Sequence, residues 1–143
     1  MSYKTGTDRK QLSLLPVSLD DYIPEDHMCR VIDAFTTLLD LFSLGFKYAV
    51  PKDKGCKPFD PRMMLSLYIY GYLNRVRSSR RLEAETMRNV EVMWLLGDLK
   101  PDARTICDFR KNNAGALRKT FRSKMNLPAL KAKLDPQNSV KVL

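Results

Sequence analysis

The chain has 143 residues, of which 44% are hydrophobic, and a formal charge of +9. This length and composition favour one folded domain with a real core and exclude a disordered chain. No apolar run could span a bilayer, and residues 1–11 contain no apolar signal-peptide core, so we expect a cytoplasmic protein without a membrane partner. The three cysteines form no Cys-x-x-Cys pair, which argues against a disulfide framework and a zinc site.

The positive charge is concentrated in the second part of the chain. Residues 1–60 hold 8 Lys+Arg and 9 Asp+Glu, a net charge of −1, whereas residues 61–143 hold 17 and 7, a net charge of +10. Such segregation indicates a polyanion partner on one face, and arginine, which outnumbers lysine in residues 75–122, suits phosphate oxygens and guanine edges. General solubility is the alternative, but it would not require segregated charge, so we rank nucleic-acid binding above it.

We expect residues 1–22 to form an extended arm that docks on the rest of the chain. A first helix is predicted to begin near Pro24, which suits a helix entrance, and to stop at Gly45, because glycine is typical of helix C-termini. Between them, apolar residues follow the i, i+3, i+4 spacing of one buried helix face. These residues are Val31, Ala34, Phe35, Leu38, Leu39 and Phe42.

Residues 47–59, where lysine alternates with proline and glycine, are predicted to be a loop, and a solvated connection is favoured over a phosphate contact. The next helix begins at Asp60-Pro61 and runs to Leu73. Its residues alternate as in a strand, but its start signal, its Met/Leu richness and its length favour a helix that is apolar nearly all round, hence central. Its three tyrosines are expected to pack in the core rather than to form a base-stacking platform.

Two further helices are predicted before residue 100. The first is capped by Ser78 or Ser79 and ends at Arg88, and its inward residues include Leu82, Met87 and Val90. The second runs from Val90 to Leu96 and ends at Gly97-Asp98. It contains the only tryptophan, Trp94, which is expected to anchor the core.

The stretch from Lys100 to Lys111 reads as a turn followed by a helix start. Asp102 is the predicted cap, Ile106 and Phe109 mark the apolar side, and the helix is predicted to run from Ala103 to about Phe121. A short capped helix after another short helix and a tight turn is what a helix-turn-helix DNA reader needs.

These elements predict an all-α fold: a compact helical bundle of about five helices with a helix-turn-helix-like C-terminal part. We expect three regions, namely the extended arm (1–22), a helical DNA-binding domain (23–122) and a divergent, frayed tail (123–143).

The basic half supplies the candidate DNA contacts, although a solvated surface charge is the commoner role for any single one of these residues. Contacts to the phosphate backbone are predicted for Arg75, Arg77, Arg80, Arg81, Arg118 and Lys119. Contacts to base edges are predicted for Arg104, Lys111 and Arg110.

No catalytic, metal, cofactor or small-molecule site is predicted. The carboxylates lie at helix starts or on solvated helix faces, and His27 is the only histidine, so a capping or structural role is favoured for these groups.

Five blocks of the sequence follow one another in a recognisable order: residues 14–35, 59–72 and 77–83, then Trp94, then 101–110. They resemble the N-terminal part of insertion-sequence transposases of the DDE type. The resemblance implies a helical domain that binds the terminal inverted repeats of the element in double-stranded DNA, on the bacterial nucleoid. It also implies a following RNase H-like domain whose two Asp and one Glu hold divalent metal ions. The chain stops before such a domain, so we expect a truncated transposase that is not an enzyme.

Alternatives remain open at this point. A fragment with these helices could pair with itself or with a full-length transposase and inhibit it. It could also be an inert remnant with apolar surface left uncovered near Leu117 and Phe121. Charge alone also permits RNA binding, although the sequence carries no signature of an RNA-binding module.

Overall fold

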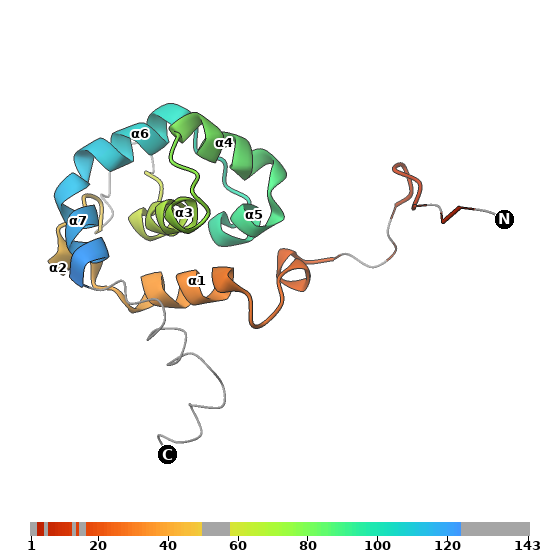
Figure 1. Ribbon diagram of the computed structural model, residues 1–143, viewed down its shortest axis with the longest axis horizontal. Helices are drawn as coiled ribbons and strands as arrows, with labels where there is room; N and C mark the ends of the chain where they lie inside the picture. Colours follow the sequence, from red (N-terminus) through yellow and green to blue (C-terminus); the bar gives the residue numbers. More distant parts are fainter. Residues whose placement is uncertain (1–2, 5, 13, 15–16, 50–57, 124–143) are drawn as a thin grey trace, which may run out of the picture.

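The computed structural model describes residues 3–4, 6–12, 14, 17–49 and 58–123. Within these ranges the chain is helical and has no strand, which confirms the all-α prediction. In Figure 1, α3 lies at the centre of the bundle, with α1 along one side and α4, α6 and α7 forming an arc around the other. The elements are the 3-10 helix η1 (Leu19–Tyr22) and the α-helices α1 (Met28–Leu38), α2 (Leu41–Leu44), α3 (Pro61–Leu73), α4 (Ser79–Arg88), α5 (Val90–Leu96), α6 (Ala103–Asn112) and α7 (Ala114–Ser123).

The central helix α3 begins where its sequence predicts. The Asp60 carboxylate accepts a hydrogen bond from the Arg62 amide at 2.9 Å, and Pro61 occupies the first turn. Leu65 and Leu67 are two positions apart, hence on nearly opposite sides of the helix, and both are fully buried. Because α3 packs against α1 and α5, it is covered on several sides, which is why its apolar residues show no single stripe.

The first predicted helix is divided into two. It begins at Met28 rather than near Pro24, because His27 caps it by accepting the Cys29 amide hydrogen bond at 3.1 Å. It ends at Leu38, and Asp40 then caps α2 through the Ser43 amide at 3.2 Å.

This break changes which apolar residues are buried. Leu39 stays in the core, but Leu38 and Phe42 are 75% and 74% exposed, so the prediction of one continuous stripe is wrong at these two positions. Gly45 ends α2 in the left-handed conformation, as predicted for a helix stop.

The boundaries of α4 and α5 agree with prediction. Asn89 separates them and caps α5, because its side chain accepts a hydrogen bond from the Glu91 amide at 3.0 Å. The inward placement of Met87 is wrong: this side chain is 57% exposed, while Thr86, one turn after Leu82, takes the buried position.

The helix predicted from Ala103 to about Phe121 is also divided in two, at Asn113. This residue is 4% exposed, and its backbone leaves helical geometry. Its side-chain oxygen accepts a hydrogen bond from the Lys47 amide at 2.8 Å, and its nitrogen donates to the Phe109 carbonyl at 3.0 Å. The five predicted helices therefore become seven, since two of them are each broken once.

Two predicted segments lie outside the described residues: most of the 47–59 loop, and the tail from residue 124 onward.

Within the predicted arm, η1 docks on α5. Asp20 joins them, because its carboxylate pairs with Arg30 at 2.9 Å and accepts a hydrogen bond from the Trp94 indole at 3.0 Å. The Arg30 guanidinium lies 5.1 Å from the Trp94 ring centre, so Trp94 combines its half-buried packing with a polar contact to the arm.

Candidate nucleic-acid interface

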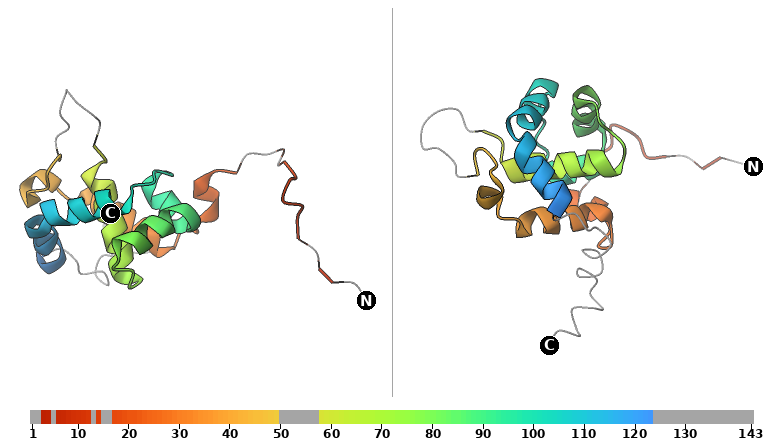
Figure 2. Two further views of the ribbon diagram at one scale, coloured as in Figure 1. Left: turned by 90° about the horizontal axis from the view of Figure 1, so that it is seen from above. Right: turned by 60° about the vertical axis from the view of Figure 1, so that its left-hand side comes forward.

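All nine predicted DNA-contacting residues are exposed. They lie on the turn after α3 and on α4, α6 and α7, the elements that form the arc over α3 in Figure 1. Figure 2 shows α4 and α6 side by side, in agreement with their direct packing. The predicted residues therefore share one region of the bundle, although they do not all face the same way.

The turn after α3 is held by its backbone. The Val76 amide donates to the Gly71 carbonyl at 2.7 Å and the Arg75 amide to the Tyr72 carbonyl at 3.4 Å, which is the hydrogen-bond pattern of a Schellman motif. Arg75 takes the left-handed position of this motif, with a φ of 58°. A Cβ on Gly71 would lie 2.6 Å from the Val76 carbonyl oxygen, so only glycine permits this close approach. The motif fixes the direction in which Arg77 leaves the turn.

Helix α6 presents two of the predicted base-reading residues together. Asp102 caps the helix by accepting the Thr105 amide at 2.7 Å, and this hydrogen bond holds the pKa of the Asp102 carboxyl below its usual value. Ile106 is fully buried and marks the inner side. At about 100° per residue, Arg104 and Lys111 lie within about 20° of each other on the opposite, outer side.

Arg110 has a different environment from that pair. Helix geometry places it about 40° from Ile106, hence toward the interior of the arc. Its charge faces the Tyr68 phenol, and it lines a groove rather than the outer face of α6. The predicted base-reading set is therefore split between two surfaces.

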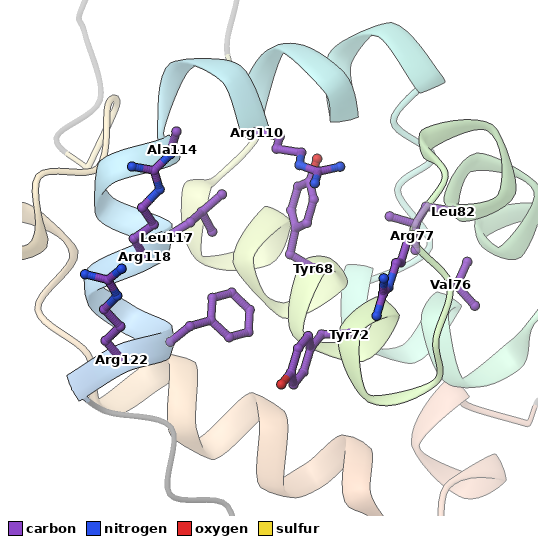
Figure 3. A pocket seen from close by; sticks show the side chains of 11 residues that line it. Tyr68, Tyr72, Val76, Arg77, Leu82, Arg110, Ala114, Leu117, Arg118 and Arg122 are labelled. Atoms are coloured by element: carbon purple, nitrogen blue, oxygen red, sulfur yellow. The ribbon is translucent and has the colours of Figure 1, made fainter.

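This groove, which we call the arginine groove, lies between α3 and α7 and has a volume of about 550 Å³. Figure 3 shows guanidinium groups arranged around aromatic and aliphatic side chains. Arg118 and Arg122, one turn apart on α7, line one side, and Arg77 and Arg110 also belong to the lining. No carboxylate lines the groove, and none of these four arginines forms an ion pair within the part of the chain that the structure describes. Three of them were predicted as contacts; Arg122 was not, although its i, i+4 spacing from Arg118 signals a shared face.

The aromatic floor of the arginine groove has one fixed ring and one open ring. Tyr68 donates its hydroxyl to the Ile106 carbonyl at 2.6 Å and stacks on Phe109 at 5.6 Å, and burial raises the pKa of its phenol to about 12. Tyr72 is 62% exposed, and its ring centre lies 5.2 Å from that of Phe121, at 55° to it. The prediction that the tyrosines pack in the core is therefore right for Tyr70, which is 5% exposed, and wrong for Tyr72.

The remaining predicted residues lie outside the groove lining. Arg80 and Arg81 are exposed in the first turn of α4, and Lys119 is exposed on α7, about 100° around the helix from Arg118.

A separate cluster brings together three groups of the types that bind metal ions. The ligand atoms of His27, Cys29 and Glu91 lie within 4.8 Å of one another. His27 Nδ1 accepts the Cys29 amide hydrogen bond, so in neutral His27 the proton is on Nε2, which lies 3.0 Å from the Glu91 carboxylate. Burial raises the pKa of the Cys29 thiol to about 12, which keeps it protonated. Tyr70 completes the cluster by donating to Glu91 at 2.8 Å. These hydrogen bonds make the cluster a junction between α1, α3 and α5.

Comparison with known families shows to which family the chain belongs. A family model described as a transposase domain (DUF772) matches residues 17–112, about two-thirds of the sequence. The chain belongs to this transposase-domain family. The match runs from η1 to the end of α6, so the transposase domain contains Arg77 and Arg110, whereas the α7 side of the arginine groove lies beyond the matched residues.

Neither the curated proteins nor the solved structures gave a match to this transposase domain. Among its described helices, none combines the length and apolar character that crossing a bilayer would require.

Proposed function

We propose that this transposase domain binds double-stranded DNA at the terminal inverted repeats of its element, on the nucleoid of a bacterial cell. The observation that carries the proposal is the outer face of α6, where Arg104 and Lys111 are both exposed, two helical turns apart. The order of α5, a turn ending at Asp102 and a capped α6 fits the helix-turn-helix arrangement, in which the second helix enters the major groove.

The roles divide by position. Arg104 and Lys111 read base edges, because they project from the outer side of the helix that enters the groove. The phosphate backbone on either side is contacted by residues from the flanking elements, which fixes the register of the protein on the duplex. These residues are Arg75, Arg77, Arg80, Arg81, Arg118 and Lys119. Arg110 leaves the base-reading set, because it lines the arginine groove.

Titration of terminal-repeat DNA against a scrambled duplex, at several salt concentrations, tests the proposal. Arg104→Ala is expected to cost about 1–3 kcal/mol on the repeat and little on the scrambled duplex. Arg80→Ala is expected to weaken both equally and to reduce the salt slope by about 1. Arg88→Ala is the matched control on α4, since Arg88 is exposed but pairs with Glu85. Equal affinity for both duplexes, or affinity independent of salt, would contradict the proposal.

A second candidate function is pairing with another transposase copy, of this chain or of the full-length protein. It is favoured by the exposure of Leu38 and Phe42, two large apolar side chains at the break between α1 and α2. Light scattering over a concentration series tests it: self-association that Leu38→Ser weakens supports pairing, whereas a monomer at every concentration that does not co-purify with a full-length copy contradicts it.

A further inference from the structure

We propose that the arginine groove binds an unpaired DNA strand, with bases stacked on Tyr72 and Phe121 and phosphates held by the surrounding guanidinium groups. This inference rests on the proposed function, because it assigns a second contact, which shares Arg77 and Arg118 with the first, to the same DNA partner.

The chemistry of the groove distinguishes a single strand from a duplex. A duplex presents phosphates outward but keeps the faces of its bases stacked inside, so it could satisfy the arginines without covering the aromatic floor. A single strand presents both phosphates and free base faces, and the combination of a cationic groove with exposed aromatic rings is the usual way to bind it. A volume of about 550 Å³ is in the range of small-ligand sites and has room for a few nucleotide units at most.

The aromatic rings are placed for stacking rather than only for packing. Tyr72 is 62% exposed, and Phe121, half-buried, meets it at an angle of 55°, so the two rings form an open wedge. Tyr68 is held by its hydrogen bond to the Ile106 carbonyl and also lines the groove. Arg118 and Arg122 are separated by one helical turn, about 6 Å along α7, which places two guanidinium groups in a row beside the wedge.

Charge argues against other occupants. The sequence that follows α7, residues 124–143, has four lysines and one aspartate, and a second copy of the chain has a net charge of +9. Both have the same sign as the groove, so four arginines without a lining carboxylate favour an anionic occupant. An acidic peptide would satisfy the charge, but it offers no flat ring for Tyr72.

Fluorescence anisotropy tests the proposal by comparing a labelled single strand with the duplex of the same sequence. The strand has about ten nucleotides, a length within the range of known single-strand sites. Tyr72→Ala is expected to weaken single-strand binding about 5- to 150-fold, the usual effect of losing one stacked base, while duplex affinity stays within about twofold. Tyr72→Phe, which keeps the ring, is expected to retain wild-type binding. Tyr22→Ala is the matched control, because Tyr22 is 57% exposed and lies on η1. Arg122→Gln is expected to weaken single-strand binding and to lower its salt dependence.

Single-strand binding that is unchanged by Tyr72→Ala, in a variant with a wild-type circular dichroism spectrum and melt, would overturn the assignment. Displacement of the strand by a polyglutamate peptide at equal concentration would also overturn it, in favour of a peptide site. In both cases intact duplex binding would leave the proposed function standing, whereas loss of duplex discrimination alone would count against the proposed function only.

Discussion

Replacing Asn113 by alanine is expected to destabilise the protein, although the residue is a single polar side chain between two helices. Its side-chain oxygen accepts a hydrogen bond from the Lys47 amide at a site that is 4% exposed. The Phe109 carbonyl keeps the Asn113 backbone N–H as a donor at 3.0 Å, so only the Lys47 amide loses its partner, at a cost of about 1–3 kcal/mol. Alanine recovers at most about 0.7 kcal/mol through its higher helix propensity, so we expect a net loss of about 1–2 kcal/mol.

Urea unfolding followed by far-ultraviolet circular dichroism measures this loss as a lower midpoint with an unchanged slope. Asn112→Ala is the matched control, since Asn112 is the same residue type, adjacent and exposed, and its replacement should change stability by less than about 0.5 kcal/mol. If the Asn113 variant is no less stable than the Asn112 variant, the hydrogen bond to the Lys47 amide does not stabilise the break between α6 and α7, and this reasoning is refuted.

Three other predictions follow from features outside that break. Gly71→Ala should destabilise the protein by about 1–3 kcal/mol in thermal or urea unfolding, because the new Cβ would lie 2.6 Å from the Val76 carbonyl oxygen. The control Gly115→Ala on α7, where nothing lies within 4 Å of the new Cβ, should be neutral or stabilising by up to about 1 kcal/mol, and equal effects of the two substitutions would contradict the steric argument. Iodoacetamide at pH 8, followed by peptide mapping, should label exposed Cys107 in the native protein and Cys29 only after unfolding, since Cys29 is 1% exposed and its thiol has a pKa of about 12. Equal labelling of the two cysteines would show that Cys29 is accessible in the native protein. The free energy of unfolding should decrease between about pH 9 and pH 12, because Cys29 and Tyr68 keep their protons in the folded state but release them at lower pH in the unfolded state. A free energy of unfolding that stays constant over this pH range would contradict the burial of both groups.

Local signals explain what could be predicted from the sequence. Asp60-Pro61, Ser78, Gly97 and Asp102 each mark a helix boundary that the structure confirms, because capping depends on neighbouring residues and on backbone conformation at one position. The exposure of the nine candidate residues was likewise foreseeable, since charged side chains are costly to bury without partners.

Long-range contacts explain which features could not be predicted from the sequence. Asn113 breaks a helix by bonding to Lys47, which lies 66 positions earlier, and no local pattern around residue 113 reveals that partner. The openness of Tyr72 depends on how α7 turns after the break, so the arginine groove was not foreseeable from periodicity. The break before α2 was not predicted either: Asp40 caps α2 in the structure, whereas the apolar stripe through Leu38 and Phe42 favoured one continuous helix.

The contact between Trp94, Arg30 and Asp20 makes the single tryptophan an intrinsic optical reporter of the N-terminal segment. Trp94 does not line the arginine groove, so an oligonucleotide seated there leaves its indole untouched. A red shift in its emission upon adding DNA would therefore signal release of η1 from α5, and an unchanged spectrum would signal that η1 remains docked while DNA is bound.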